Sequence, residues 1–134
     1  MYLLDTNIVS DARRKMPQVV NWMRSIDPQL AYLSVITLGE LTRGIAQLKQ
    51  KDVVAASALR VWFAKLKIAH ENRTLAIDDA IAIEWGRISA LRSRGDADAL
   101  IAATAAVHNF ILVTRNTRDF EDTGVALFNP WEQG

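Results

Sequence analysis

Near the start of the chain stands Tyr2-Leu3-Leu4-Asp5-Thr6-Asn7, where three apolar residues run directly into a carboxylate and two further polar side chains. A short apolar run that is bounded by polar residues predicts a buried β-strand. Asp5 would then lie at the exposed end of this strand, where the chain turns toward a helix. The segment therefore predicts a buried strand with an acid at its carboxyl end.

Outward from this segment, short apolar strands alternate with amphipathic helices along the chain. Strands are predicted at 2–4, 31–33, 75–77, 111–113 and 125–128. Helices are predicted at about 7–14, 17–25, 52–66 and 97–108, after an N-cap at Ser34, and from Asp78-Asp79 onward. Such short apolar strands between helices are typical of a parallel sheet that is covered on both faces. We expect an α/β fold, a three-layer α/β/α sandwich.

The composition limits the possible classes of protein. A chain of 134 residues predicts one domain over 1–134, and 50% hydrophobic residues predict a globular one. The net charge of +1 carries no general nucleic-acid signature, so any RNA affinity must come from local basic patches. The absence of cysteine excludes thiolate metal sites and fits a reducing compartment. Asp5 interrupts any N-terminal signal sequence, and no apolar stretch has membrane-spanning length, so we expect a cytoplasmic protein.

Four acids from separate segments are predicted to meet at one edge of the sheet. In open parallel sheets, ligands bind outside the carboxyl ends of the strands. Asp5 ends the first strand, and Asp119 lies in the loop after strand 111–113. Glu40 lies near the start of the helix after strand 31–33, and Asp98 lies in the first turn of the apolar helix 97–108.

This much negative charge at one edge indicates a bound cation. Neighbouring carboxylates repel and raise one another's pKa unless a cation offsets them. Ligands that are all oxygen favour Mg²⁺ or Mn²⁺ over zinc. Such an ion activates water and polarises a phosphoryl oxygen, so the pattern points to a metal-dependent hydrolase acting on a phosphodiester.

Each acid also has an interpretation as a helix cap. Asp5 can cap the first helix, and Thr37-Leu38-Gly39-Glu40 matches a capping box. Asp98 lies at a helix start, where the dipole favours anions, and Asp119 belongs to a turn-forming segment. Capping alone does not require the four acids to share one sheet edge.

The chain resembles a PIN domain, specifically the VapC-type toxins of bacterial toxin–antitoxin pairs and their FitB-like relatives. The matching segments are Leu3–Asn7, Leu33–Leu41, Asp98–Ala105 and Thr114–Phe120, in the family's order and at its usual separations. The resemblance implies a Mg²⁺-dependent endoribonuclease acting on tRNA or ribosomal RNA, with Mn²⁺ as a possible substitute. It also implies a small antitoxin with a DNA-binding domain as partner, and a homodimer.

The resemblance further implies roles for single residues. Asp5 and Asp98 would be the direct metal ligands, whereas Glu40 and Asp119 would act partly through waters, with Glu40 positioning or deprotonating the attacking water. Thr6 and Asn116 would be supporting residues that orient the cluster. The loop before Asp98 is shorter than in many relatives, so Asp96 is an alternative ligand; the run Ala99–Thr104 favours Asp98, with Asp96 as an accessory.

Basic and aromatic residues suggest further contacts. Arg115 and Arg118 flank the Asp119 loop and are predicted to bind RNA phosphates. Alternatively, they belong to a solvated loop or pair with Glu121 and Asp122. Lys49, Lys51, Arg92 and Arg94 are expected to be solvating charges. The hydrophobic residues around Trp62 and Phe63 lead to the hypothesis that helix 52–66 forms a groove for the antitoxin or a dimer partner.

Two other functions compete with the nuclease. A non-catalytic module that keeps the acidic edge and acts through a DNA-binding partner is the main alternative. A phosphotransfer domain with an aspartyl nucleophile is disfavoured because Asn7 stands where an Asp-x-Asp motif needs its second acid.

Overall fold

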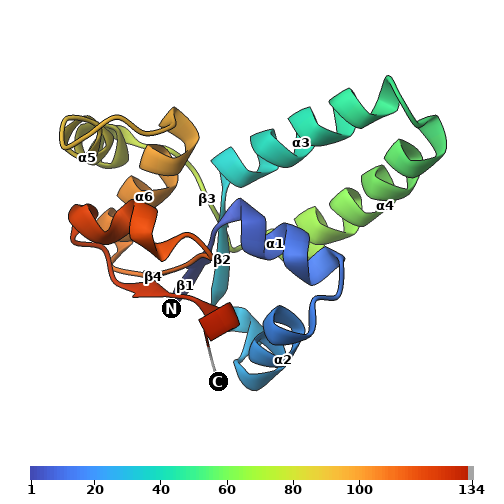
Figure 1. The fold of residues 1–134 in the computed structure, drawn as a ribbon, viewed down its shortest axis with the longest axis horizontal. Coiled ribbons are helices and arrows are strands. Elements are labelled where there is room, and N and C mark those ends of the chain that lie inside the picture. Colours follow the sequence, from blue (N-terminus) through green and yellow to red (C-terminus); the bar gives the residue numbers. More distant parts are fainter. Residues whose placement is uncertain (133–134) are drawn as a thin grey trace.

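The computed structural model describes residues 1–132, so the last two residues of the predicted 1–134 domain lie outside the described range. Within that range five strands form one sheet in the order β3-β2-β1-β4-β5, and each neighbouring pair is parallel. The strands are β1 (Tyr2–Leu4), β2 (Ala31–Ser34), β3 (Thr74–Leu75), β4 (Ile111–Val113) and β5 (Leu127–Phe128). Helices lie on both sides of this sheet, which confirms the predicted α/β/α architecture (Figure 1).

The helices begin close to the predicted positions, and polar caps explain several of these starts. They are α1 (Thr6–Arg13), α2 (Pro17–Ser25), α3 (Val35–Lys49), α4 (Val53–Ala69), α5 (Asp79–Ser89) and α6 (Asp96–His108). The hydroxyl of Ser34 accepts the N–H of Ile36 at the start of α3, as the sequence predicts. The Asp52 carboxylate accepts the N–H of Ala55 in the same way at the start of α4.

Some element boundaries differ from the predictions. Strand β3 ends at Leu75 and β5 begins at Leu127, so both are shorter than predicted, and α4 continues to Ala69. Short 3₁₀-helices at Pro28–Leu30, Thr117–Thr123 and Pro130–Glu132 were not predicted. These short helices have no long hydrophobic period, so sequence periodicity does not reveal them.

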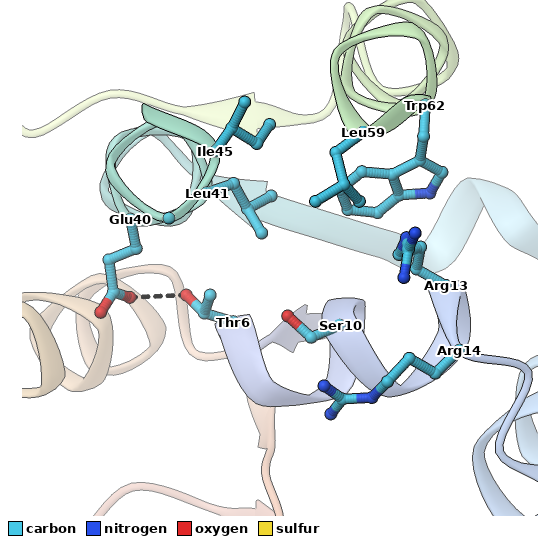
Figure 2. A pocket seen from close by; sticks show the side chains of 10 residues that line it. Thr6, Ser10, Arg13, Arg14, Glu40, Leu41, Ile45, Leu59 and Trp62 are labelled. Atoms are coloured by element: carbon cyan, nitrogen blue, oxygen red, sulfur yellow. Dashed lines mark hydrogen bonds between the residues drawn. The ribbon is translucent and has the colours of Figure 1, made fainter. Parts of the chain in front are cut away.

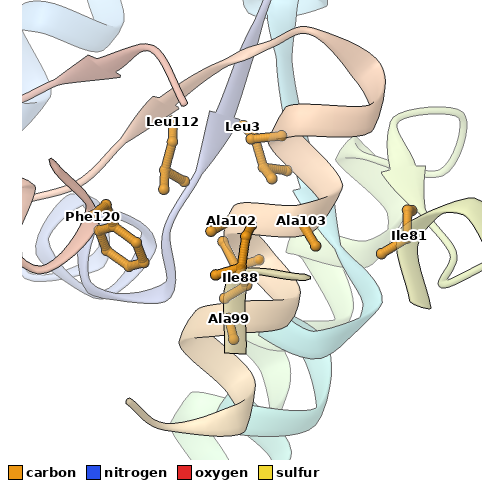
Figure 3. Packing of buried hydrophobic residues seen from close by; sticks show 10 residues of the cluster. Leu3, Ile81, Ile88, Ala99, Ala102, Ala103, Leu112 and Phe120 are labelled. Atoms are coloured by element: carbon orange, nitrogen blue, oxygen red, sulfur yellow. The ribbon is translucent and has the colours of Figure 1, made fainter. Parts of the chain in front are cut away.

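Alternating residues of the strands fill two cores, one on each face of the sheet. Leu3 and Leu112 are fully buried in a cluster that includes Ile88 of α5, Ala102 of α6 and Phe120 of the 3₁₀-helix Thr117–Thr123 (Figure 3). The next residues along the strands, Leu4 and Val113, face the opposite layer. There they join a cluster with Ile8, Val9, Val19, Ala31 and Leu33, into which partly buried residues of α2, α3 and α4 also pack. This period of two residues is the ordinary consequence of strand geometry.

The strand order creates a crevice at the carboxyl ends of β1 and β4. From β1 the chain proceeds to β2 and β3 on one side of the sheet, and then crosses over to β4 and β5 on the other. Leu4 is in register with Val113, and the Asp5 N–H donates to the Val113 carbonyl at 2.9 Å. The residues that follow β1 and β4 therefore meet at the point of the sheet where ligands bind in this class of fold.

Helices α3 and α4 pack against each other and form an arm that reaches away from the sheet in Figure 1. Val53 and Val54, near the tip of this arm, are 61% and 82% exposed. Among the described residues, none of the helices combines the length and the apolar character needed to cross a membrane.

Candidate active site

Asp5 is held by donors that follow the two strands of the crevice, β1 and β4. Its Oδ1 accepts the N–H of Thr6 at 2.8 Å, so Asp5 does cap α1. Its Oδ2 accepts the hydroxyl of Thr114, the first residue after β4, at 2.8 Å, and lies 3.4 Å from the Asn7 amide nitrogen. Capping thus engages one of the two carboxylate oxygens, and the other is bound across the crevice.

Burial gives the Asp5 carboxyl an unusual pKa. The side chain is 4% exposed, and this desolvation raises the pKa from 3.8 to about 6. The hydrogen bonds from Thr114 and Thr6 oppose the rise, whereas the carboxylates of Asp98 and Glu40 add to it. A buried acid that is surrounded by further acids is an arrangement that a bound cation relieves.

Glu40 approaches Asp5 from α3 through the side chain of Thr6. The Thr6 hydroxyl donates to Oε1 of Glu40 at 2.6 Å (Figure 2) and lies 3.0 Å from the hydroxyl of Thr37. Because α3 begins at Val35 with Ser34 as its cap, Glu40 lies in the second turn of the helix. The alternative interpretation of Thr37 to Glu40 as a capping box is therefore wrong.

Asp98 enters the site from the first turn of α6. This helix begins after Gly95, so Asp98 does not serve as its N-cap. The pKa of the Asp98 carboxyl is raised by burial first and then by the carboxylates of Glu40 and Asp119, and Arg94 lowers it. Asp96, the predicted accessory ligand, is exposed at the start of the same helix.

The structure brings three of the four predicted acids together in one open hollow. Asp5, Glu40 and Asp98 line a hollow of about 330 Å³, whose other lining residues are Thr6, Asn7, Ser10, Arg14 and Arg115. Asp119 lines a neighbouring hollow of about 250 Å³, together with Asp98 and residues 92–95. The Asp119 side chain is 59% exposed, and its carboxylate lies 3.9 Å from Arg92. Asp98 therefore borders both hollows, and Asp119 lies one step further from Asp5.

The donor set suits a hard cation such as Mg²⁺, which is held by oxygen atoms. Within residues 1–132, however, no three side chains of His, Cys, Asp or Glu are placed so that together they could hold an ion. Glu40 is turned toward Thr6, and Asp119 lies over the neighbouring hollow. Mg²⁺ commonly keeps several waters and uses one or two carboxylates, so Asp5 and Asp98 could hold it without a third acid.

The sequence predicted Thr6 and Asn116 as supporting residues, and the supporting contacts of Thr114 and Asn7 were missed. Asn116 is exposed, and it reaches the cluster through its backbone N–H, which donates to the Thr114 hydroxyl at 3.1 Å. A signal for Thr114 was available, because it follows strand 111–113 directly, as Asp5 follows strand 2–4. In neighbouring parallel strands in register, such residues lie side by side.

Arg92 and Arg94 fix the turn that carries Asp119. Arg92 donates to the Asp119 carbonyl at 2.7 Å and Arg94 donates to it at 3.0 Å. The Arg94 side chain is 5% exposed and forms an ion pair with Asp122. The expectation that Arg94 is a solvating charge is therefore wrong.

The two arginines that were predicted to bind phosphate lie in different surroundings. Arg115 lines the hollow with Asp5, and its Nε lies 3.2 Å from the carboxylate of Asp11. Arg118 is exposed on the 3₁₀-helix Thr117–Thr123. Arg115 therefore pairs with Asp11 of α1 and not with the alternative partners, which were Glu121 and Asp122.

Residues 2–126 match the PIN domain family. The chain therefore belongs to the PIN domain family, as its four matching segments indicate. Within that family it is similar to the toxin FitB of Neisseria gonorrhoeae, with 37% identity over 98% of this chain and 99% of the relative. It is also similar to the VapC ribonuclease Y4jK of Sinorhizobium fredii, with 33% identity over 98% and 99% of the two chains.

Solved structures show the same fold. A crystal structure of FitAcB from Neisseria gonorrhoeae superposes with a TM-score of 0.88 and 34% identity over 98% of this chain and 99% of that chain. A toxin–antitoxin complex from Klebsiella pneumoniae superposes with a TM-score of 0.74 and 25% identity over 98% and 99% of the two chains. The expected FitB-like membership of the PIN family is confirmed.

Proposed function

We propose that the protein is the toxin of a toxin–antitoxin pair and acts as a Mg²⁺-dependent endoribonuclease on tRNA or ribosomal RNA. The names of its relatives support the class, since one is a toxin and another a VapC ribonuclease. The observation that carries the proposal is the buried carboxyl of Asp5, whose pKa is raised to about 6 and which shares an open hollow with Glu40 and Asp98. Capping α1 accounts for one oxygen of Asp5 and explains neither the neighbouring acids nor the hollow.

In this proposal Asp5 and Asp98 hold the cation, with Mn²⁺ able to replace Mg²⁺, and Asp119 contributes through water from the adjoining hollow. When bound, the cation supplies Lewis-acid activation of the attacking water and of the phosphoryl group. Thr114 and Thr6 fix the two oxygens of Asp5, so its orientation is set before metal arrives. The absence of His and Cys from the hollow's lining favours an oxygen-binding ion over zinc.

Glu40 is the proposed base. The hydroxyl of Thr6 holds one carboxylate oxygen of Glu40, which leaves the other to accept a proton from water. The water oxygen forms a bond to phosphorus, Glu40 takes the water's proton, and the bond from phosphorus to the leaving oxygen breaks. The leaving oxygen then takes a proton from solvent. Thr6 is thus a positioning residue that orients Glu40.

An antitoxin with a DNA-binding domain is the proposed protein partner, in the reducing cytoplasm that the cysteine-free sequence fits. A solved structure with the same fold is a toxin–antitoxin complex. A hollow of about 280 Å³ lies between α1, α3 and α4 and leads to Glu40, with Leu41, Leu59 and Trp62 among its lining residues (Figure 2). Trp62→Ala is expected to weaken antitoxin binding, and Ile83→Ala, at a 74% exposed position of α5 outside this hollow, serves as the control. The proposed homodimer is tested by the mass of the purified protein in solution.

The test of the nuclease is cleavage of total tRNA and ribosomal RNA by the partner-free protein. Reactions contain Mg²⁺, Mn²⁺ or EDTA, with Asp5→Asn alongside. Discrete metal-dependent fragments that are absent with Asp5→Asn support the proposal and reveal the target class. Retention of full activity by Asp5→Asn would remove the acidic cluster from the mechanism, and absence of metal binding would favour the non-catalytic module.

A further inference from the structure

A second carboxylate, Asp11 of α1, is buried next to the acidic hollow. Its side chain is 1% exposed, and three partners surround it: Arg14 of the same helix, and Arg115 and Trp131 from distant parts of the chain. One oxygen accepts a hydrogen bond from Arg14 at 2.9 Å. The other accepts the indole N–H of Trp131 at 3.0 Å and lies 3.2 Å from Nε of Arg115.

Both arginines that Asp11 holds reach the hollow in which Asp5, Glu40 and Asp98 lie. Arg14 and Arg115 are among the lining residues of that hollow, and they are 53% and 42% exposed. The Arg14 side chain extends back along α1 in the direction of Ser10 (Figure 2). Trp131 adds a second restraint, because the guanidinium carbon of Arg115 lies 5.9 Å from the centre of its ring.

The contacts with Asp11 leave most of the donors of each guanidinium available. A guanidinium has five N–H donors; Asp11 engages Nε of Arg115 and one terminal nitrogen of Arg14. Two arginines against one buried acid also leave a net positive charge on this side of the hollow. Guanidinium groups match phosphate oxygens in pairs, so this side suits a phosphate group rather than a metal ion.

We infer that Asp11 is a positioning residue that holds Arg14 and Arg115 to bind a second phosphate of the RNA, beside the one that is cleaved. This inference rests on the proposed function and assigns each side of the hollow a different phosphate. The scissile phosphate lies over Asp5 and Asp98, and a neighbouring phosphate of the same strand contacts the two arginines. The favoured substrate is therefore a polynucleotide rather than a molecule with a single phosphodiester.

The test compares two substrates that differ in the neighbouring phosphate. One is a single-stranded oligoribonucleotide with one cleavable linkage, and the other is a dinucleoside monophosphate, which contains only the phosphodiester to be cleaved. The ratio of the two kcat/KM values is measured for the wild type, Asp11→Asn, the double variant Arg14→Gln/Arg115→Gln, and the triple variant. Arg24→Gln on the exposed side of α2 is the matched control for loss of a positive charge.

We expect Asp11→Asn to lower this ratio about 10-fold, the effect of roughly 1.4 kcal/mol. The double variant lowers it at least as much, and adding Asp11→Asn to the double variant has little further effect, because Asp11 acts through the arginines. A general loss of folding lowers kcat/KM for both substrates by the same factor and leaves the ratio unchanged. The inference would be overturned if Asp11→Asn left the ratio unchanged. It would also be overturned if Asp11→Asn lowered the ratio as much in the double arginine variant as it does in the wild type.

A binding measurement separates this inference from the proposed cleavage. Fluorescence anisotropy in EDTA gives the affinity for a labelled oligoribonucleotide at several salt concentrations. Each arginine that contacts a phosphate contributes about 0.7 to the slope of log K against log salt, so the double variant is expected to reduce the slope by about 1.4. If the wild type cleaves neither substrate, the nuclease proposal fails, and the inference stands or falls on this slope alone. A slope equal to that of Arg24→Gln refutes it.

Discussion

Replacing Asp5 by asparagine is expected to stabilise the metal-free protein at neutral pH while it abolishes activity. The cause is the burial of the carboxyl group, which is 4% exposed and has a pKa of about 6 in the fold against an ordinary 3.8. Because the folded pKa is the higher one, the fold favours the neutral acid. This favourable contribution is complete below about pH 3.8 and is lost as the pH rises through about 6.

The magnitude follows from the difference between the two pKa values. Between 3.8 and about 6, at about 1.36 kcal/mol per pH unit, the wild type loses about 3 kcal/mol of stability that Asp5→Asn retains. The new amide nitrogen faces the Thr114 hydroxyl and the Asn7 amide in place of an acceptor oxygen. That change subtracts roughly 1 kcal/mol at every pH and leaves the pH dependence intact.

Urea unfolding at pH 4, 5, 6 and 7.5 in EDTA, followed by tryptophan fluorescence, measures this difference. We expect the free energy of unfolding of Asp5→Asn, relative to the wild type, to rise by about 2–3 kcal/mol from pH 4 to pH 7.5. Mg²⁺ should reverse the order at neutral pH, because ligand binding stabilises only the protein that retains the site. If the difference in free energy of unfolding between Asp5→Asn and the wild type did not vary with pH, a raised pKa of the buried Asp5 carboxyl would be refuted.

Three further substitutions, the first of them with a control, test other parts of the account. Leu3 of β1 is fully buried, so Leu3→Ala is expected to lower the free energy of unfolding, measured in urea, by about 2–5 kcal/mol. The control Val54→Ala, at an exposed position, should lower it by less than about 0.5 kcal/mol. Equal effects of the two substitutions would contradict the core assignment. Arg94→Gln should destabilise the fold by about 1–3 kcal/mol, since Arg94 is buried against Asp122, and a loss below 0.5 kcal/mol would show that this ion pair contributes nothing. Thr6→Val should slow single-turnover RNA cleavage about 10-fold by releasing Glu40, with little change in RNA affinity; an unaltered rate would remove Thr6 from the mechanism.

The fold was predictable because its strands are short apolar runs with clear ends. Leu3-Leu4 and Leu112-Val113 alternate between two cores. Short apolar segments of this kind are usually buried strands in a globular protein. Boundaries were less predictable where tertiary contacts decide them. The arm helix α4 continues to Ala69 although its sequence pattern weakens after Leu66, and the 3₁₀-helix Thr117–Thr123 depends on contacts with distant arginines.

The site was predictable for the acids that follow strands and less so for their partners. Asp5, Glu40 and Asp98 were placed at one edge from their positions after the predicted strands and near the predicted helix starts, and the structure gathers them in one hollow. The contact of Asp5 with Thr114 spans 109 residues of sequence, and that of Asp11 with Trp131 spans 120. No local pattern signals the pair of Asp11 and Trp131, and for this reason Asp11 was not singled out from the sequence.

Binding of Mn²⁺ to the purified, partner-free protein, measured by electron paramagnetic resonance, is the most direct test of the carboxylate site. The wild type, Asp5→Asn and Asp98→Asn are compared with Asp52→Asn, which alters an acid that only caps α4. The account predicts that the wild type and Asp52→Asn bind Mn²⁺ and that Asp5→Asn and Asp98→Asn lose at least 10-fold in affinity. Equal binding by all four proteins would show that Asp5 and Asp98 are not metal ligands.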